Sequence, residues 1–230
     1  QGMILVVGPT RSGKTTTLYS SMMQLNDPSI KIITVEDPVE YQLPGLNQMQ
    51  MNPQIGVTFA DGLRHILRQD PDVILVGEIR DRETAEIAIQ AAQTGHLVLS
   101  TLHTNDAAGA ITRLQDMGIP GFLINSAVLG VLSQRLVRRV CSVCKGQSGK
   151  NGQKCRHCGS SGFRGRIGIY ELLVFDDDVR QAVKRNCSSS EINKIAIQHG
   201  MIPLLQCGRN LVHAGITTED ELARAVSTGG

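Results

Sequence analysis

The stretch Gly8–Thr15, which reads GPTRSGKT, constrains this chain more than any other feature. It satisfies the P-loop pattern, in which a glycine and four free residues precede Gly-Lys-Thr. The apolar run MILVV comes directly before it, and a helix is predicted over Lys14–Leu25 directly after it. Backbone amides at such a strand-to-helix junction can cradle phosphate groups. The sequence therefore predicts an α/β fold that binds a nucleotide.

The loop and the first turn of the helix have expected roles in holding ATP. The Lys14 ammonium can reach the outer phosphates, and the Thr15 hydroxyl can ligate Mg²⁺. A chance glycine-rich turn is the alternative, and the agreement of strand, loop, lysine and helix disfavours it. The predicted nucleotide-contacting residues are Gly8, Pro9, Thr10, Ser12, Gly13, Lys14, Thr15 and Thr16.

Arg11 places a long cationic side chain within this loop. The pattern leaves its position free, since only the backbone there must face the phosphates. If the position requires a left-handed backbone, a residue other than glycine adds strain of about 1 kcal/mol. We therefore expect the guanidinium to turn outward and the site to work.

Acidic side chains follow two of the predicted strands. Asp37 and Glu40 come after the run IITV, and Glu78 comes directly after VILVG. Ligands bind at the carboxyl ends of strands in a parallel sheet, so these acids are expected at the nucleotide site. We assign Glu78, together with Thr15, to the magnesium shell, and Glu40 to the role of general base or water-positioning residue. The alternative is that each is a solvated acid at the start of a loop.

Two histidines flank the predicted strand LVLST. His103 follows the strand, on the expected ligand edge, where it could sense the terminal phosphate. His96 precedes the strand, and its role is less defined by position. A lone histidine is more often a satisfied core or surface residue, which is the alternative for both.

Strands and helices alternate through the first part of the chain, with further helices expected at residues 107–117 and 122–133. The strands are apolar along their whole length, a pattern typical of a mostly parallel sheet covered on both faces. The character changes after about Gln134. We predict an ATPase core over residues 1–133, a four-cysteine element with flanking strands over 134–175, and a helical subdomain over 176–230.

The C-terminal subdomain contains two predicted capping boxes. Ser188 is followed three residues later by Glu191, and Thr218 by Glu221. Such a pair can satisfy free backbone donors at the start of a helix. Both pairs therefore predict the first turns of helices.

Composition narrows the class of partner. Aromatic residues make up 3% of the chain and the net charge is +2, which gives little stacking surface and no large basic excess for nucleic acid. No apolar run reaches the roughly 20 residues that cross a bilayer. We expect a cytoplasmic location and, from the start at Gln1, the C-terminal portion of a longer protein.

Four cysteines have the spacing of metal ligands. Cys141 and Cys144 form one CxxC pair, and Cys155 and Cys158 form a second, after ten intervening residues. Four thiolates close a tetrahedral Zn²⁺ site with no open position. Disulfides are disfavoured in the cytoplasm, so a structural zinc is the preferred interpretation. His157 lies too close to the neighbouring ligands to be a further partner.

Four segments in order resemble the Walker A, Asp box, Walker B and His box of the secretion ATPases, the hexameric motors of type II secretion and type IV pilus assembly. These segments are GPTRSGKTTTLY, TVEDPVEY, LRQDPDVILVGEIRDRETAEIA and TGHLVLSTLHTNDA. The similarity continues through QRLVRRVC and GFRGRIGIYELL to GITTEDELARAV, and so covers essentially the whole chain. Arg11 departs from the family, which usually has glycine there.

The resemblance implies a RecA-like P-loop ATPase core with a zinc knuckle and a small helical C-terminal region. It implies Glu40 as the catalytic glutamate, Glu78 as the Walker B acid, and His96 with His103 as the His box. Arg80 and Arg82 could couple the site to a neighbour or serve as salt bridges. The implied cofactors are ATP, Mg²⁺ and Zn²⁺.

The resemblance also implies partners and a location. The full-length protein is expected to be a homo-hexamer that binds an inner-membrane platform protein, with peripheral membrane association through its partners and no nucleic acid. Because assembly motors commonly carry the knuckle and retraction motors generally lack it, an assembly or export motor is expected. A nucleic-acid translocase and a non-hydrolysing assembly subunit are the two alternatives.

Overall fold

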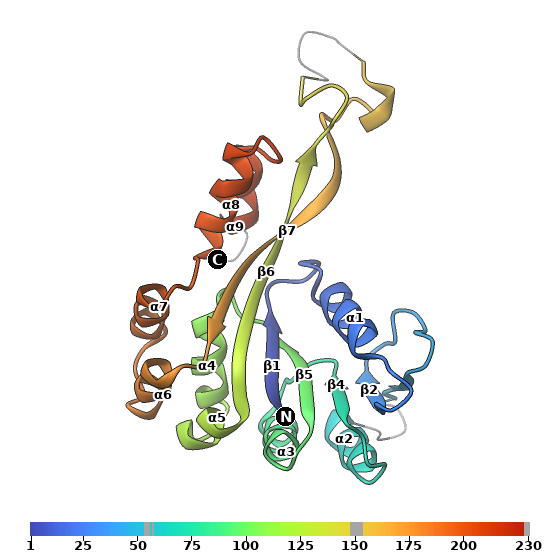
Figure 1. Ribbon diagram of the computed structural model, residues 1–230, viewed down its shortest axis with the longest axis vertical. Helices are drawn as coiled ribbons and strands as arrows, with labels where there is room; N and C mark the ends of the chain where they lie inside the picture. Colours follow the sequence, from blue (N-terminus) through green and yellow to red (C-terminus); the bar gives the residue numbers. More distant parts are fainter. Residues whose placement is uncertain (53–55, 57, 148–153, 228–230) are drawn as a thin grey trace.

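The computed structural model describes residues 1–52, 56, 58–147 and 154–227 as a mixed α/β fold (Figure 1). The strands are β1 Gly2–Val7, β2 Ile32–Glu36, β3 Asn47–Gln50, β4 Val73–Val76, β5 Leu97–Leu102, β6 Val128–Val140 and β7 Phe163–Val174. The helices are α1 Lys14–Leu25, α2 Phe59–Leu67, α3 Arg82–Gln93, α4 Ala107–Asp116, α5 Gly121–Ala127, α6 Asp177–Lys184, α7 Ser189–Gln198, α8 Leu204–His213 and α9 Glu219–Ser227. A short 3₁₀ turn, η3, spans Arg156–Cys158.

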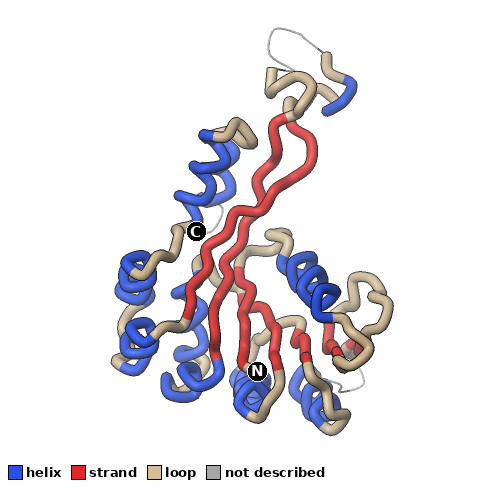
Figure 2. Tube along the Cα trace, viewed as in Figure 1, coloured by secondary structure: helices blue, strands red, loops and turns tan. Residues whose placement is uncertain are grey.

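The strands form one seven-stranded sheet in the order β3-β2-β4-β5-β1-β6-β7. Neighbouring strands are parallel except for β6 and β7, which pair antiparallel. The expectation of a mostly parallel sheet is therefore confirmed. β6 and β7 are also the longest strands, and they extend as a hairpin beyond the rest of the sheet (Figure 2).

Both faces of the sheet are covered, because successive strand residues point to opposite sides. Met3, Leu5 and Val7 pack into a large cluster with apolar residues of α2 to α5. Val6 instead joins Leu18 and other residues of α1 on the opposite face. Within the described residues, no helix is long and apolar enough to cross a membrane.

The helix expected over residues 122–133 is wrong in its second half. Helix α5 ends at Ala127, and Val128–Ser133 form the first part of β6. Here Met3 of β1 lies opposite Val128, and Val7 lies opposite Ser133, in a parallel register. The free side of β1 accepts this apolar segment as a strand, and that long-range pairing overrides the local helical pattern. The expected boundary between residues 133 and 134 thus falls inside β6.

The C-terminal helices attach to the rest of the fold at two places. Helices α6 and α7 pack beside α5 and α4, and α7 contributes Ile192 to the large cluster. Helices α8 and α9 pack against the β6–β7 hairpin, where Leu222 joins Val137 and Ile169 in a separate small core. Helices α8 and α9 therefore support the part of the hairpin between the main sheet and the hairpin tip (Figure 1).

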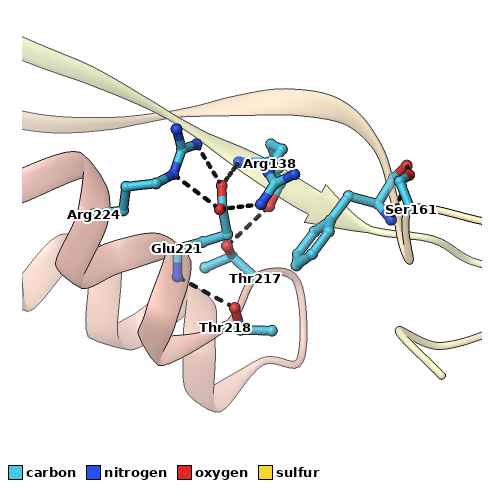
Figure 3. Close-up of polar contacts among 7 residues, drawn as sticks. Arg138, Ser161, Thr217, Thr218, Glu221 and Arg224 are labelled. Atoms are coloured by element: carbon cyan, nitrogen blue, oxygen red, sulfur yellow. Dashed lines mark hydrogen bonds and ion pairs between the residues drawn. The ribbon is translucent and has the colours of Figure 1, made fainter. Parts of the chain in front are cut away.

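The two predicted capping boxes differ in the structure. Ser188 and Glu191 form a complete box at the start of α7. At α9 the Glu221 backbone donates to the Thr218 hydroxyl, 3.3 Å away, but the Glu221 carboxylate turns toward β6. It accepts hydrogen bonds from the Arg138 backbone at 3.2 Å, the Arg138 guanidinium, and Arg224 Nε at 3.1 Å (Figure 3). This carboxylate therefore joins α9 to β6 instead of completing the capping box of its own helix.

Replacing Glu221 with Gln is expected to destabilise the protein at neutral pH by about 1 to 3 kcal/mol, the range for hydrogen bonds to a charged group. The side chain is only 3% exposed, and hydrogen bonds from Arg138 lower its pKa to about 2 from the usual 4.5. A lowered folded-state pKa contributes stability above pH 4.5, and that contribution is lost as the pH falls toward 2. Denaturant unfolding at pH 7 and at pH 3 measures the difference.

The matched control is Glu219→Gln, since Glu219 is exposed in the first turn of the same helix. The destabilisation caused by Glu221→Gln should shrink between pH 7 and pH 3, whereas Glu219→Gln should have a small effect at both. A Glu221→Gln difference that stays constant across this interval would contradict the expectation.

Candidate nucleotide and metal sites

The P-loop connects the end of β1 to the start of α1, as predicted. Gly13 immediately precedes α1 with φ 90°, a left-handed backbone that favours glycine. A Cβ atom on Gly8 would lie 2.4 Å from the carbonyl oxygen of Gln134, so any side chain there would collide with β6. Both glycines of the pattern are therefore required by the fold itself, independently of a ligand.

The Lys14 side chain lies over the loop. Its ammonium donates to the carbonyl oxygens of Gly8 at 2.8 Å and Pro9 at 3.1 Å. Burial lowers the pKa of Lys14, and the neighbouring Glu78 opposes that shift. The cation is thus held at the loop, next to an acid on the same edge of the sheet.

A cavity of about 640 Å³ opens at the carboxyl ends of the parallel strands. Several predicted site residues line it, drawn from the loop, from α1 and from three other strand ends: Thr10, Ser12, Gly13, Lys14, Thr15, Thr16, Glu40, Glu78 and His103. Gly8 and Pro9 do not line the cavity, and their carbonyl oxygens instead accept hydrogen bonds from Lys14. The fold therefore brings together residues that are up to 93 positions apart, Thr10 and His103.

Glu78 lies at the centre of a charged cluster in this cavity. Its side chain is 15% exposed and forms an ion pair with Arg80. His103 Nε2 lies 3.4 Å from the second carboxylate oxygen, and Arg80 also lies 4.0 Å from Asp37. Arg80 thus serves as a salt-bridge residue, one of its two expected roles, and His103 is close to the acid.

Glu40 lies on the segment between β2 and β3, at the wall of the same cavity. The residue is exposed, and within the described residues its carboxylate has no hydrogen bond or ion pair. A carboxylate with free acceptor atoms beside the P-loop is suited to orienting water. Glu40 therefore stays the predicted water-orienting residue of this site.

His96 is not brought to the cavity. It precedes β5, whereas His103 follows that strand, so the two histidines lie at opposite ends of β5. The His96 Nδ1 atom lies 2.9 Å from the carbonyl oxygen of Ala91 at the end of α3. Since a six-residue strand separates the two, we propose no direct contact of His96 with nucleotide in this chain.

Two residues of β6 to which no role was assigned from the sequence lie behind the site: Gln134 supports the P-loop, and Arg135 supports the segment after β5. Gln134 donates to the Ser12 carbonyl at 2.8 Å and accepts from the Thr17 hydroxyl at 2.7 Å. Arg135, 4% exposed, donates to the carbonyl of Asn105, close to His103. The signal in the sequence was the polar run Ser133–Arg135 directly after the apolar first part of the strand, because buried polar side chains are usually hydrogen-bonded.

Arg11 has φ 65°, so the left-handed backbone considered for this position is present. Its side chain is exposed and forms no ion pair within the described residues.

Replacing Arg11 with Gly is expected to change nucleotide affinity less than tenfold, which is under about 1.4 kcal/mol. Isothermal titration calorimetry of a nucleotide with each of the two proteins measures the affinity. A clear loss of affinity in Arg11→Gly would show instead that the guanidinium contacts phosphate.

The four predicted cysteines meet at the far end of the β6–β7 hairpin (Figure 1). Their sulfur atoms all lie within 4.8 Å of one another, and the sulfurs of Cys144 and Cys158 are 3.7 Å apart. Tetrahedral ligation with Zn–S bonds near 2.3 Å would place sulfur atoms about 3.8 Å apart. The donor set and its spacing therefore fit Zn²⁺. Part of the segment between the two pairs, residues 148–153, lies outside the described residues.

His157 lies beside this cluster without belonging to it. Its Nδ1 atom lies 3.1 Å from a guanidinium nitrogen of Arg164. The metal-binding group found among the described residues consists of the four cysteines alone. His157 therefore stays outside the proposed ligand set.

A P-loop after β1, an acid after β4 and the intervening strand β5 define the chain as a P-loop nucleotide-binding protein with a RecA-like core. The family model described as "Type II/IV secretion system protein" matches residues 1–224. The chain belongs to this family.

Curated relatives agree with this assignment. "Type II secretion system protein E" of Pseudomonas aeruginosa is 53% identical over 242 residues, covering 97% of this chain and 48% of the relative. "Type IV pilus assembly ATPase PilB" of Thermus thermophilus is 50% identical, covering 98% of this chain and 28% of the relative. The chain thus spans about half the length, or less, of these relatives.

Solved structures share the fold. The crystal structure of the pilus retraction motor PilT with bound ADP has a TM-score of 0.76 at 35% identity, covering 97% of this chain and 61% of that one. The ATPase DotB of Legionella pneumophila has a TM-score of 0.75 at 26% identity, covering 99% of this chain and 60% of that one.

Proposed function

We propose that this chain is the ATP-hydrolysing part of a motor that drives pilin or pseudopilin assembly, in a type IV pilus or a type II secretion system. The observation that carries the proposal is the single cavity that combines the P-loop with Glu40, Glu78 and His103. The identity of about half with a type II secretion protein E and with PilB supports the choice of system.

The residues of the cavity divide the work of hydrolysis. The P-loop amides and Lys14 would bind the phosphates, and Thr15 with Glu78 would hold Mg²⁺, which neutralises charge on the phosphates when bound. Glu40 would orient the attacking water and accept its proton. His103, beside Glu78, would sense the state of the terminal phosphate.

The cysteine cluster has a structural role in this proposal. Cys141, Cys144, Cys155 and Cys158 would hold one Zn²⁺ as four thiolates, which leaves no coordination position for a substrate. The cluster closes the tip of the β6–β7 hairpin, remote from the P-loop along the same strands. Zinc would therefore stabilise the tip without taking part in hydrolysis.

The whole protein would act as a homo-hexamer on the cytoplasmic face of the inner membrane, bound to a platform protein. Type II secretion protein E and PilB, at 53% and 50% identity, are closer to this chain than PilT, a retraction motor, at 35%. An assembly or export motor is therefore favoured over a retraction motor.

The first test is the replacement of Lys14 with Ala. Loss of a charge-assisted hydrogen bond of about 1.5 to 3 kcal/mol should weaken binding of Mg²⁺-ATP roughly 10- to 150-fold. Isothermal titration calorimetry measures the affinity, with Lys184→Ala as the control, since Lys184 is exposed on α6. Equal affinities of the Lys14→Ala variant and the wild type would contradict nucleotide binding at this loop.

A further inference from the structure

Glu36, the last residue of β2, is a buried carboxylate that the proposed chemistry does not use. It is 4% exposed and forms part of the wall of the nucleotide cavity. It accepts hydrogen bonds from the Thr34 hydroxyl at 2.6 Å, from Gln48 Nε2 at 3.2 Å and from the Tyr19 hydroxyl. Burying a carboxylate is costly unless it is hydrogen-bonded, and these three donors offset that cost.

The partners of Glu36 come from three different elements. Tyr19 belongs to α1, the helix that starts at the P-loop, and its side chain lies in the core beneath the cavity. Thr34 belongs to β2 itself, and Gln48 belongs to the edge strand β3. The carboxylate therefore joins the P-loop helix to the two strands that bracket the segment of residues 37–46.

That segment carries Glu40, and the same network holds it on two sides. The Tyr19 and Tyr41 rings meet edge to face, with centroids 4.8 Å apart and an interplanar angle of 78°. Gln48 Nε2 also donates to the Tyr41 carbonyl at 3.2 Å, and Gln48 Oε1 accepts from the Leu43 amide at 2.6 Å. Both contacts with Tyr41 fix the residue directly after Glu40.

Tyr19 is suited to remain a hydrogen-bond donor in this network. Burial and the hydrogen bond to Glu36 both raise the pKa of the Tyr19 phenol, so the hydroxyl keeps its proton at neutral pH. Gln48 Nε2 lies 3.4 Å from the same hydroxyl oxygen and donates to it. The Tyr19 hydroxyl thus joins α1 to Glu36 and to Gln48, the residue that also contacts Tyr41.

We propose that Tyr19, acting through Glu36, is a positioning residue that fixes the segment bearing Glu40 against the P-loop helix. The inference rests on the proposed function, because it concerns the geometry of that reaction. The Glu40 carboxylate has no side-chain partner among the described residues, so its place depends on the backbone that carries it. A displacement of about 1 Å at a reacting group can cost 10²-fold in rate.

The test begins with Tyr19→Phe, which removes one hydroxyl and keeps the ring that contacts Tyr41. Single-turnover hydrolysis of ATP is expected to slow about tenfold, while ATP affinity changes less than threefold, because Tyr19 acts on Glu40 and not on the phosphates. Tyr170→Phe, the same substitution on β7, is the control and should change neither quantity. An equal loss in affinity and rate would overturn the proposal.

A double-mutant cycle separates positioning from a general structural role. In the Glu40→Gln background, Tyr19→Phe should slow hydrolysis less than twofold further, since the group it positions is gone. A full tenfold further loss would overturn the inference while leaving the proposed function intact. If Glu40→Gln alone does not slow hydrolysis, the assignment of Glu40 fails, and the inference fails with it.

A second variant covers the case in which Tyr19→Phe does not fold. Gln48→Met keeps the length of the side chain and removes its hydrogen bonds to Glu36, Tyr41 and Leu43 from the opposite side of the segment. The same pattern is expected, with slower hydrolysis, nearly unchanged affinity and less than a twofold further effect in the Glu40→Gln background. Additive losses with Glu40→Gln would overturn the proposal here too.

Discussion

Replacing Glu40 with Gln is expected to lower the rate of ATP hydrolysis by about 10² or more while leaving ATP binding nearly intact. The amide keeps the size of the side chain but cannot accept a proton from water. Glu40 lines the cavity, exposed and without a side-chain partner among the described residues, so the substitution breaks no side-chain contact of the carboxylate recorded in the structure. Single-turnover hydrolysis gives the rate, and calorimetric titration with Mg²⁺-ATP gives the affinity.

Glu219→Gln is again the matched control, because it makes the same chemical change on α9, far from the cavity. Its hydrolysis rate and affinity should equal those of the wild type. Equal losses of binding and turnover in Glu40→Gln would assign Glu40 to ligand contact. An unchanged rate would move the catalytic role to another acid of the cavity.

Replacing Cys158 with Ser is expected to remove the zinc and loosen the tip of the β6–β7 hairpin. The wild type should contain one zinc per chain, and the variant close to none, because three thiolates and a hydroxyl are a much weaker donor set than four thiolates. The melting temperature should fall. Affinity for ATP should stay the same, since the cluster lies at the end of the hairpin that extends beyond the rest of the sheet (Figure 2).

Elemental analysis of protein purified with reductant measures the zinc, and differential scanning calorimetry measures the melting temperature. Cys187→Ser is the control, since Cys187 lies outside the cluster and packs beside the main core. It should keep the full zinc content. Absence of metal from the wild type would end the zinc proposal, and loss of ATP binding in Cys158→Ser would show that the hairpin tip and the cavity are coupled.

Local patterns in the sequence were enough to predict the P-loop and the cysteine cluster. A P-loop is a continuous run with a fixed backbone geometry, and Gly13 has the left-handed backbone that its place before α1 requires. Each CxxC pair is likewise local, so only the meeting of Cys141 and Cys155 depended on the fold. Apolar strands alternating with helices predicted the parallel sheet for a similar reason, because burial on both faces makes each strand apolar along its whole length.

Residues whose roles come from partners far along the chain were missed or misplaced. Glu36, Gln134 and Arg135 appear in the sequence as polar residues at the ends or in the middle of strands, and their hydrogen-bond partners lie on other elements. Glu221 matched a capping box, yet its carboxylate pairs with Arg138, which is 83 residues away. A polar residue in an apolar run indicates that a buried hydrogen-bond partner exists, but not which residue that partner is.

The sequence by itself determined the P-loop, the two CxxC pairs and the class of fold, because each depends on backbone and side-chain chemistry within a few neighbouring residues. Only the tertiary structure decided that residues after Ala127 become the long strand β6, since that outcome depends on pairing with β1. It also placed His103 beside Glu78, and His96 at the opposite end of β5. Strand order and register determine which of these residues lie close together. Both arise from contacts between segments far apart in the chain, which no local pattern records.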